Sequence, residues 1–187
     1  MQSMLYTSYY NSPLGKIMLA ADEEGLTGIW LENQKYYAGG LKEKTVNREV
    51  DILKEAKRWL DIYFSGREPG FTPHIHMVGS DFRKTVWNIL LEIPYGHTMT
   101  YGDIARRIAA EKGIAKMSAQ AVGGAVGHNP ISIIIPCHRV VGTNGSLTGY
   151  AGGIDKKVQL LTLENVDMSL FFIPNRFLDT CKSEAER

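Results

Sequence analysis

The sequence NPISIIIPCHRVVG occupies residues 129–142 and joins an apolar run to three chemically reactive side chains. Residues 131–135 are almost wholly β-branched and apolar, a pattern that predicts a short buried strand. A thiol, an imidazole and a guanidinium follow closely: Cys137, His138 and Arg139. A buried strand that leads into a thiol beside a base and a cation indicates a candidate nucleophilic site.

Two interpretations of Cys137 are open at this point. A free cysteine often serves only as a small buried hydrophobe. A reactive thiolate needs a nearby base or a positive environment, and both His138 and Arg139 are adjacent. Neighbouring side chains on an extended chain point to opposite faces, so a Cys137–His138 contact requires a bend at Pro136 or a bridging water. A histidine base also needs a third group to fix its tautomer, and Glu164 is a candidate whose approach the spacing alone does not establish.

The segments around this stretch are mostly helical. Their apolar spacing predicts helices over residues 81–91, 101–111, 118–127 and 155–164. Thr100 followed three residues later by Asp103 is a capping-box pattern, and Gly113 is the expected end of the helix that it opens. The second and third helices resemble a helix-turn-helix, although any two short consecutive helices give this pattern.

The third of these helices, residues 118–127, consists almost entirely of small residues in the sequence SAQAVGGAVG. It lacks the long side chains that reach base edges in the major groove. A smooth surface of alanine and glycine suits a close approach to a narrow groove or to a sugar-phosphate backbone.

The N-terminal third predicts a sheet and one helix. Short aromatic and β-branched runs over residues 4–10, 15–22 and 25–31 are separated by turn sequences. A helix is predicted over residues 48–64, with Asn47 as its N-cap and Gly66 at its end.

Together these elements predict an α+β fold with two domains. Residues 1–79 would form a small N-terminal α/β domain, an antiparallel sheet plus a helix. Residues 80–168 would form a mainly helical, winged-helix-like domain with the helix-turn-helix and the reactive site. Residues 169–187 would form a C-terminal tail.

Composition is that of an ordinary globular protein. The 187 residues are 44% hydrophobic and 22% charged, and the formal net charge of +1 creates no strong overall field. No signal sequence opens the chain and no apolar run approaches the ~20 residues of a membrane span. With only two cysteines, Cys137 and Cys181, we expect reduced thiols and a cytoplasmic protein without membrane contact.

Metal and nucleotide sites are not expected. Cys137 and His138 are too close in sequence for ordinary structural zinc spacing, and there is no Cys-x-x-Cys pair. His74 and His76 alternate along one face and could share a metal, but a surface or hinge position is favoured. No phosphate-cradling loop or dinucleotide fingerprint is present.

One family matches these motifs. NPISIIIPCHRVVG, with TYGDIA upstream and GYAGG and LLTLE downstream, strongly resembles the O6-alkylguanine-DNA alkyltransferases, the methylated-DNA–protein-cysteine methyltransferases. The resemblance runs from about Phe82 to Glu164, and the N-terminal third agrees in element order only. It implies repair of O6-alkylguanine, and of O4-alkylthymine, by transfer of the alkyl group to Cys137 after the base is flipped into a pocket. It also implies one reaction per molecule, no cofactor, and a monomer that binds double-stranded DNA through the minor groove.

The resemblance assigns roles by motif position. Three residues would be catalytic: Cys137 as the nucleophile, His138 as a base acting through a water, and Glu164 as the group that holds the imidazole. Substrate-binding roles would fall to Tyr101, Asn129, Tyr150, Ala151, Gly152 and Lys157. DNA-binding roles would fall to Thr100, Ala119, Gln120, Ala121 and Gly124. With His138 and Glu164 beside it, the Cys137 thiol is expected to have a pKa below its ordinary value.

Two residues depart from the family pattern. Gln120 stands where many relatives carry an arginine that fills the gap left by the flipped base, and Ala151 stands where some carry a serine. Three alternatives are weaker: a protein that binds alkylated guanine without reacting, a Cys-His-Glu thiol hydrolase, and a transcriptional regulator with an alkyltransferase domain. Cys137 opposes the first, the matched alkyl-acceptor pocket opposes the second, and the lack of an added DNA-binding module or metal–cysteine cluster opposes the third.

Overall fold

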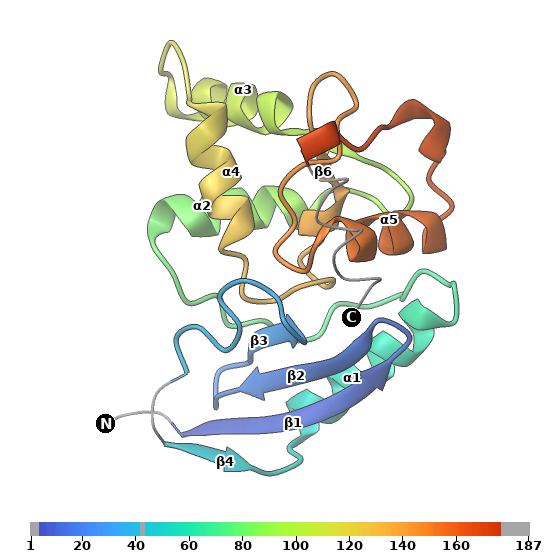
Figure 1. Cartoon of the computed structure of the whole chain (residues 1–187). Coiled ribbons are helices and arrows are strands. Elements are labelled where there is room, and N and C mark those ends of the chain that lie inside the picture. Colours follow the sequence, from blue (N-terminus) through green and yellow to red (C-terminus); the bar gives the residue numbers. More distant parts are fainter. Residues whose placement is uncertain (1–3, 42–43, 177–187) are drawn as a thin grey trace.

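The computed structural model describes residues 4–41 and 44–176 of the chain. Cys181 and the rest of the expected tail beyond residue 176 lie outside this part. In Figure 1 a sheet with one helix lies below a mainly helical C-terminal half. The α+β class expected from the sequence is confirmed.

The N-terminal sheet has four strands in the order β3-β2-β1-β4. These are β1 (Leu5–Ser12), β2 (Gly15–Ala21), β3 (Leu26–Leu31) and β4 (Thr45–Asn47). The first three are antiparallel, as expected, whereas β4 runs parallel to β1 at the outer edge, so the sheet is mixed and not wholly antiparallel. Gly15, with a φ of 103°, closes the turn between β1 and β2 in a conformation that residues with side chains disfavour.

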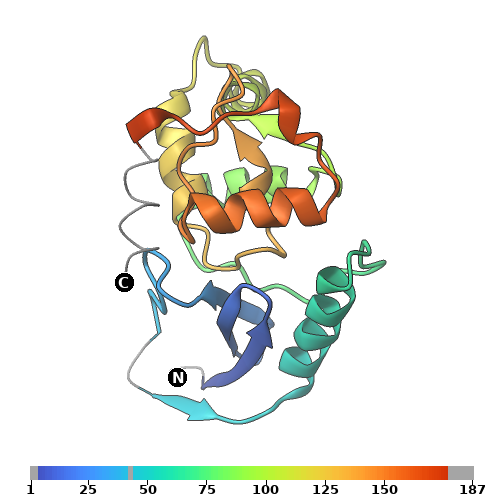
Figure 2. The same cartoon turned by 45° about the vertical axis from the view of Figure 1, so that its right-hand side comes forward.

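Helix α1 (Asp51–Phe64) packs against this sheet, as Figure 2 shows from the side. Its start at Arg48 and its cap at Asn47, both expected from the sequence, are wrong. Asn47 pairs with Thr7 in the β4–β1 ladder, and Arg48 donates its backbone N–H to the Thr7 carbonyl. Sheet pairing therefore occupies the backbone that the first helical turn would need. The expected end is confirmed, since Gly66 follows the helix with a φ of 83°.

The C-terminal half contains α2 (Asp81–Leu91), α3 (Tyr101–Lys112), α4 (Ala119–Gly127) and α5 (Ile154–Leu163). The capping box of Thr100 and Asp103 opens α3, Gly113 ends it in the left-handed conformation, and the Ser118 side chain caps α4. Helices α3 and α4 pack together as a helix-turn-helix, with α2 against α4. A short 3-10 turn, η2 (Met168–Leu170), follows α5.

A two-stranded parallel ladder links the start of α3 to the reactive segment. Its strands are β5 (Met99–Thr100) and β6 (Val140–Val141). Tyr101 directly follows β5 and Arg139 directly precedes β6. The ladder therefore holds the first residue of the helix-turn-helix beside the segment that carries the cysteine.

The strand expected over residues 131–135 is wrong. These residues form a tight loop, in which the Ile135 N–H donates to the Ile131 carbonyl and Ile133 has a φ of 73°. The β-branched run indicated burial correctly, because these three isoleucines are 0% exposed. Its backbone groups are taken locally by Asn129, whose Oδ1 accepts from the Ile131 N–H and whose Nδ2 donates to the Ile135 carbonyl at 2.8 Å. An asparagine side chain that satisfies nearby backbone groups favours a turn over a strand.

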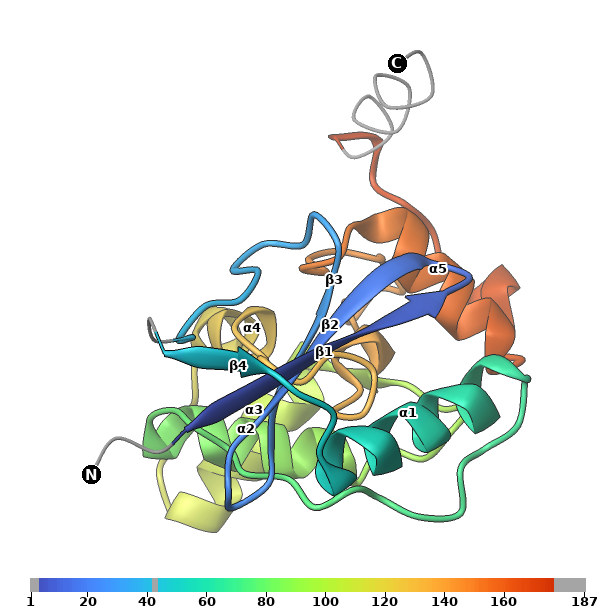
Figure 3. The same cartoon turned by 90° about the horizontal axis from the view of Figure 1, so that it is seen from below.

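This loop is anchored on the N-terminal sheet. The Ile29 N–H in β3 donates to the Pro130 carbonyl at 2.8 Å, and the Ser132 N–H donates back to the Ile29 carbonyl at 3.0 Å. One apolar cluster includes Leu60 of α1 and Cys137. Figure 3, seen from below, shows the sheet crossing under the C-terminal helices. Both halves therefore support the segment that carries the reactive residues.

Candidate active site

Cys137 lies in a single 3-10 turn, η1 (Cys137–Arg139), directly after Pro136. Pro136 adopts a φ of −82° and a ψ of 65°, and the Cys137 N–H donates to the Ile135 carbonyl at 2.8 Å. The bend expected at this proline is therefore present. Cys137 is 4% exposed, so its thiol is enclosed behind the molecular surface.

His138 is completely buried, and its ring is oriented through Nε2. This atom lies 2.6 Å from Oε1 of Glu164, the residue that caps the end of α5. Because a carboxylate can only accept, Nε2 carries the hydrogen and the neutral ring keeps its lone pair on Nδ1. Nδ1 is buried and has no hydrogen-bond partner among the described residues. The contact between His138 and Glu164, which the sequence spacing alone did not establish, is therefore present.

The Glu164 carboxylate accepts further hydrogen bonds. Its donors are the Tyr63 hydroxyl at 2.7 Å, Arg139 Nε and Nη2 at 2.9 and 3.0 Å, and the Gly96 N–H at 3.2 Å. Burial raises the pKa of Glu164, but the bonds and charges of His138 and Arg139 outweigh it and lower that pKa to about 2. Glu164 is therefore a carboxylate at neutral pH.

Tyr63 reaches this cluster from α1 in the N-terminal half. Its hydroxyl donates to Glu164 and lies 3.4 Å from His138 Nε2. Burial raises the pKa of Tyr63 well above its ordinary value, and the negative charge of Glu164 adds a smaller increase. The tyrosine is therefore a neutral donor next to the histidine–glutamate pair.

Burial also sets the charge of the histidine and the cysteine. It lowers the pKa of His138, although the bond to Glu164 opposes this, and it raises the pKa of the Cys137 thiol. The Asn129 amide and the Lys157 ammonium oppose the second effect without cancelling it. The expectation of a lowered thiol pKa is therefore wrong, because enclosure among apolar side chains disfavours the thiolate more than its neighbours favour it.

Lys157 lies on α5 and is 0% exposed. Its ammonium donates to the Val140 carbonyl at 2.5 Å and to the Thr148 carbonyl at 3.2 Å. Burial lowers its pKa to about 8, and a thiolate at Cys137 would raise it again. A buried cation thus lies within electrostatic reach of the sulfur.

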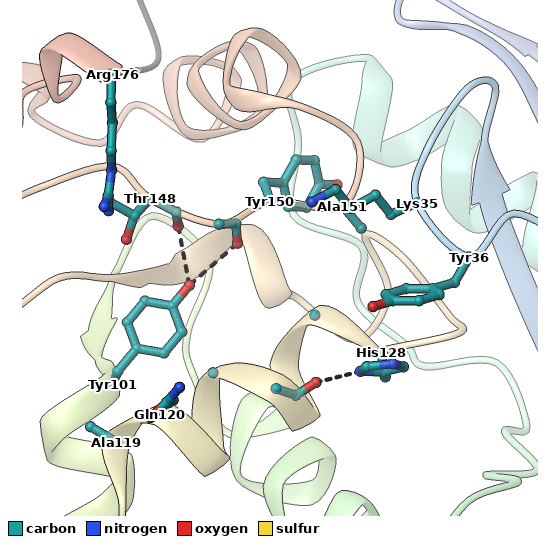
Figure 4. A pocket seen from close by; sticks show the side chains of 14 residues that line it. Lys35, Tyr36, Tyr101, Ala119, Gln120, His128, Thr148, Tyr150, Ala151 and Arg176 are labelled. Atoms are coloured by element: carbon teal, nitrogen blue, oxygen red, sulfur yellow. Dashed lines mark hydrogen bonds between the residues drawn. The ribbon is translucent and has the colours of Figure 1, made fainter.

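A pocket of about 590 Å³ opens between α4 and the loop that carries Tyr150 (Figure 4). Tyr101 forms one wall and donates its hydroxyl to the carbonyls of Thr148 at 3.1 Å and Gly149 at 3.3 Å. A charge on Cys137 would raise the pKa of both Tyr101 and Tyr150, whose pKa values burial already raises. The thiol is therefore within electrostatic reach of two tyrosines that line the pocket.

Some of the expected site residues lie in this pocket and others do not. The lining includes Tyr101, Ala119, Gln120, Gly124, Tyr150 and Ala151. It does not include Thr100, Ala121, Asn129, Gly152 and Lys157. Thr100 accepts from the Asp103 N–H as the cap of α3, and Ala121 is exposed on α4. Gly152 packs so closely that a Cβ there would lie 2.8 Å from the Tyr150 ring.

The pocket also contains residues that sequence patterns did not indicate. Lys35, Tyr36, His128 and Arg176 line it. Tyr36 stacks on His128 with ring centroids 4.1 Å apart, which brings a loop of the N-terminal half against the end of α4. Tyr63 was missed as well, because its helical spacing placed it only on an apolar face.

His74 and His76, the one histidine pair that the sequence offered for a metal, have different surroundings. His76 Nδ1 lies 2.6 Å from Asp22 Oδ2, and His74 is exposed. Within the described ranges, no group of three or more His, Cys, Asp or Glu side chains could hold a metal ion. In the same part of the chain, no helix is long and apolar enough to span a bilayer.

Comparisons with known proteins agree with this architecture. Residues 5–75 match the 6-O-methylguanine DNA methyltransferase, ribonuclease-like domain, and residues 81–166 match the DNA binding domain of the same name. The chain is 45% identical to a methylated-DNA–protein-cysteine methyltransferase of Methanosarcina acetivorans over 86% of this chain and 98% of that protein. It is 39% identical to the Haemophilus influenzae protein of the same name, over 87% of each chain.

A solved structure is similar throughout. The crystal structure of Mycobacterium tuberculosis OGT in complex with DNA has a TM-score of 0.73 and 39% identity, and the match covers 90% of this chain and 94% of that one. Fold and site together define a two-domain, DNA-binding repair protein with an enclosed cysteine. The chain belongs to the methylated-DNA–protein-cysteine methyltransferase family.

Proposed function

We propose that the protein repairs O6-alkylguanine in DNA by moving the alkyl group onto Cys137 once and irreversibly. The observation that carries the proposal is the position of the thiol. Cys137 is enclosed beside a neutral, oriented histidine, and it lies within electrostatic reach of a pocket whose wall is the small-residue helix α4. The names of the relatives above support the same activity.

DNA would dock on α4 through its minor groove. Ala119, Gln120, Ala121 and Gly124 are exposed on this helix, and apart from Gln120 they have little or no side chain. A smooth helix can approach the sugar-phosphate backbone closely, and a flipped base would then enter the adjoining pocket. That a relative was crystallised with DNA supports this arrangement.

The proposed reaction balances without a co-reactant. Sulfur attacks the alkyl carbon and the bond from that carbon to O6 of guanine breaks. The thiol proton passes through a bridging water to His138 Nδ1, the basic atom of the neutral ring. His138 gives this proton up again as the guanine anion takes one up, so the net products are guanine in DNA and S-alkylcysteine, a thioether with no hydrolytic route back to the thiol.

The neighbouring charges explain how a thiol with a raised pKa could react. Glu164 would stabilise the imidazolium that forms on His138, and Lys157 would stabilise the thiolate character of the attacking sulfur. Tyr63 would act as a positioning residue, because it shares Glu164 Oε1 with the histidine. Asn129 would fix the turn that carries Cys137.

Three further features belong to this proposal. O4-alkylthymine would be a second substrate, since its alkylated oxygen is chemically similar. The protein would act as a monomer, because every group in the proposed mechanism comes from one chain. It would work in the compartment that holds the DNA, the cytoplasm in a bacterium or an archaeon.

The test is a stoichiometric reaction with a short duplex that contains O6-methylguanine. With DNA in excess, we expect product to reach a plateau at about one per protein, and the peptide that contains Cys137 should gain the mass of CH2, since a methyl group replaces the thiol hydrogen. Cys137→Ser should abolish transfer and keep duplex binding, because the sulfur supplies the chemistry and α4 supplies the docking.

Other results would identify the alternatives. Continued turnover with an unmodified Cys137 peptide would indicate a hydrolase. Tight duplex binding without any mass gain in the unsubstituted protein would indicate a non-reacting sensor.

A further inference from the structure

The helix that would meet DNA brings no charge of its own. Over Ala119–Gly127 its sequence is AQAVGGAVG, without a lysine, arginine, aspartate or glutamate. Phosphates dominate the affinity of proteins for DNA, and they are bound mainly by cationic side chains. The cations next to the pocket must therefore come from other segments.

Two cationic side chains line the pocket, and both come from outside that helix. Among the described residues of the lining, the formally charged ones are Lys35 and Arg176, and none is acidic. In Figure 4 they lie at opposite ends of the segment from Thr148 to Ala151, Lys35 beside Ala151 and Arg176 above Thr148. Both also fall outside residues 81–166, which match the DNA binding domain of the family.

The loop that carries Lys35 is fixed against the pocket. The Lys35 N–H donates to the Ala151 carbonyl at 2.9 Å. Next to it, Gln34 Oε1 accepts from the Leu31 N–H at 2.7 Å and from the Ser132 hydroxyl at 3.2 Å. The loop therefore holds a fixed place at the pocket wall.

The segment that carries Arg176 is fixed in a similar way. After η2 the chain pairs with the glycine-rich loop of residues 142–153. The Phe172 N–H donates to the Gly145 carbonyl at 3.0 Å, and the Leu147 N–H donates to the Phe172 carbonyl at 2.9 Å. Arg176 follows four residues later and is exposed. The segment thus returns from α5 to the face that α4 presents.

We propose that Lys35 and Arg176 bind backbone phosphates on the two sides of the extruded nucleotide, so that the DNA-contacting surface includes the N-terminal half and the C-terminal segment. This inference rests on the proposed function. Two cations at the pocket, whose described lining contains no acidic side chain, would attract the DNA backbone and hold the strand where its extruded nucleotide enters the pocket. Neither residue contacts the reacting atoms, so their contribution is to the affinity for DNA.

The experiment measures affinity for a duplex with O6-methylguanine over a range of salt concentrations, in a Cys137→Ser background where no transfer interferes. Each cation–phosphate contact removed should reduce the steepness of log K against log salt by about 0.9. Lys35→Gln and Arg176→Gln should therefore each reduce it by about 0.9, and the double variant by about 1.8. Between 50 and 200 mM salt each lost contact amounts to about a 3-fold smaller change in affinity.

Two control variants sharpen this test. Lys35→Arg keeps the charge and should retain the slope. Lys54→Gln removes an exposed lysine that pairs with Asp51 on α1, and it should leave both slope and affinity unchanged. In proteins that retain Cys137, the duplex reaction of the Gln variants should fall more than their reaction with free O6-benzylguanine.

Unchanged slopes would overturn the inference, as would a loss of affinity that is independent of salt. An equal fall in the duplex and free-base reactions would overturn it too, because the residues would then act on the pocket. Failure of the unsubstituted protein to alkylate Cys137 would instead refute the proposed function, and the salt dependence would still report on the cations.

Discussion

Tyr63 and His138 both contact the same atom, Oε1 of Glu164. The tyrosine hydroxyl withdraws part of the negative charge that would otherwise stabilise an imidazolium. A hydrogen bond to a charged group contributes about 1.5–3 kcal/mol to the stability of the folded protein. A change at this one hydroxyl, from the N-terminal half, should therefore alter the basicity of a histidine in the C-terminal half.

We predict that Tyr63→Phe moves the acid limb of the alkyl-transfer rate to higher pH. Without the hydroxyl, Glu164 favours the protonated ring more strongly, so the pKa of His138 rises and the neutral base is lost at a higher pH. The measurement is the rate of reaction with O6-benzylguanine between about pH 5 and pH 8. Tyr10→Phe is the control, because Tyr10 donates to Asp61 on α1 and not to this cluster. A slower reaction with an unmoved acid limb would indicate only a packing role.

Gln120 leads to a second residue-scale prediction. It is exposed on α4 and lines the pocket, where a side chain could fill the gap left by a flipped base. Extrusion requires a few kcal/mol of unstacking and unpairing, which an inserted side chain offsets in part. Gln120→Ala should slow the duplex reaction several-fold and leave the reaction with free O6-benzylguanine nearly unchanged. Gln120→Arg should hold or raise the duplex rate and steepen its salt dependence. Equal effects on both substrates would show that another residue fills the gap.

Single residues of the site could be predicted from the sequence where neighbours in sequence are also neighbours in space. Cys137 and His138 are adjacent, so their chemistry is visible in the printed chain. Tyr63 and Glu164 meet across 101 positions, and nothing in the spacing of an apolar helix face separates a core tyrosine from one that donates to a carboxylate. The raised thiol pKa was missed for a related reason, because burial depends on the whole fold.

At the scale of elements, the surface of α4 would allow the DNA backbone to approach it closely. Gly124 is exposed, and a Cβ added there would meet nothing within 4 Å. Glycine in a helix interior is about 1 kcal/mol less favourable than alanine, so Gly124 makes α4 less stable than an alanine would. A side chain at this place would project from the face that is proposed to meet DNA.

We therefore predict that Gly124→Leu leaves the fold stable but lowers the duplex reaction at least several-fold. The reaction with free O6-benzylguanine should fall less, since the leucine would block the duplex more than the pocket. Gly124→Ala is the matched control, and it should raise the free energy of unfolding by about 1 kcal/mol with little effect on the duplex rate. Unfolding in urea and single-turnover rates measure the two effects. A leucine variant with an unimpaired duplex rate would show that this part of α4 does not approach DNA closely.

Elements were predictable where their ends have local chemical signals. The capping box at Thr100 predicted the start of α3, and Gly113 predicted its end. The start of α1 and the loop at residues 131–135 were misjudged because long-range pairing with β1 and the Asn129 side chain take over their backbone groups. Whether such partners capture the backbone groups depends on a strand far away in the sequence in the first case, and on the orientation of the Asn129 amide in the second.

For the whole molecule, Glu164 is the point at which the halves of the chain meet. It accepts from Tyr63 of α1, from Gly96 before β5 and from Arg139 of η1. A buried carboxylate with these donors holds its charge, and its partner Arg139 is only 8% exposed. Removing one member of a buried ion pair leaves the other uncompensated and is strongly destabilising.

We predict that Glu164→Gln lowers the free energy of unfolding by about 3 kcal/mol near neutral pH. The effect should depend on pH with a definite sign. The pKa of Glu164 is about 2 in the folded protein, below the ordinary value of about 4.3 in an unfolded chain. Its stabilisation is thus complete above about pH 4.3 and is lost as the pH falls toward 2. Urea unfolding at several pH values should show the wild type losing about 3 kcal/mol more than the variant across that window. Parallel curves would show that Glu164 does not link folding to protonation.

The enclosure of Cys137 has a consequence for the life of the protein before it meets a lesion. A molecule that reacts only once must wait with its sulfur unoxidised, for as long as undamaged DNA surrounds it. Peroxides and other electrophiles attack thiolates that solvent can reach, whereas Cys137 is 4% exposed and its pKa is raised by burial. The same burial that makes the transfer depend on His138 thus preserves the unused protein, and an alkylated base delivered into the pocket is the electrophile that can reach the waiting sulfur.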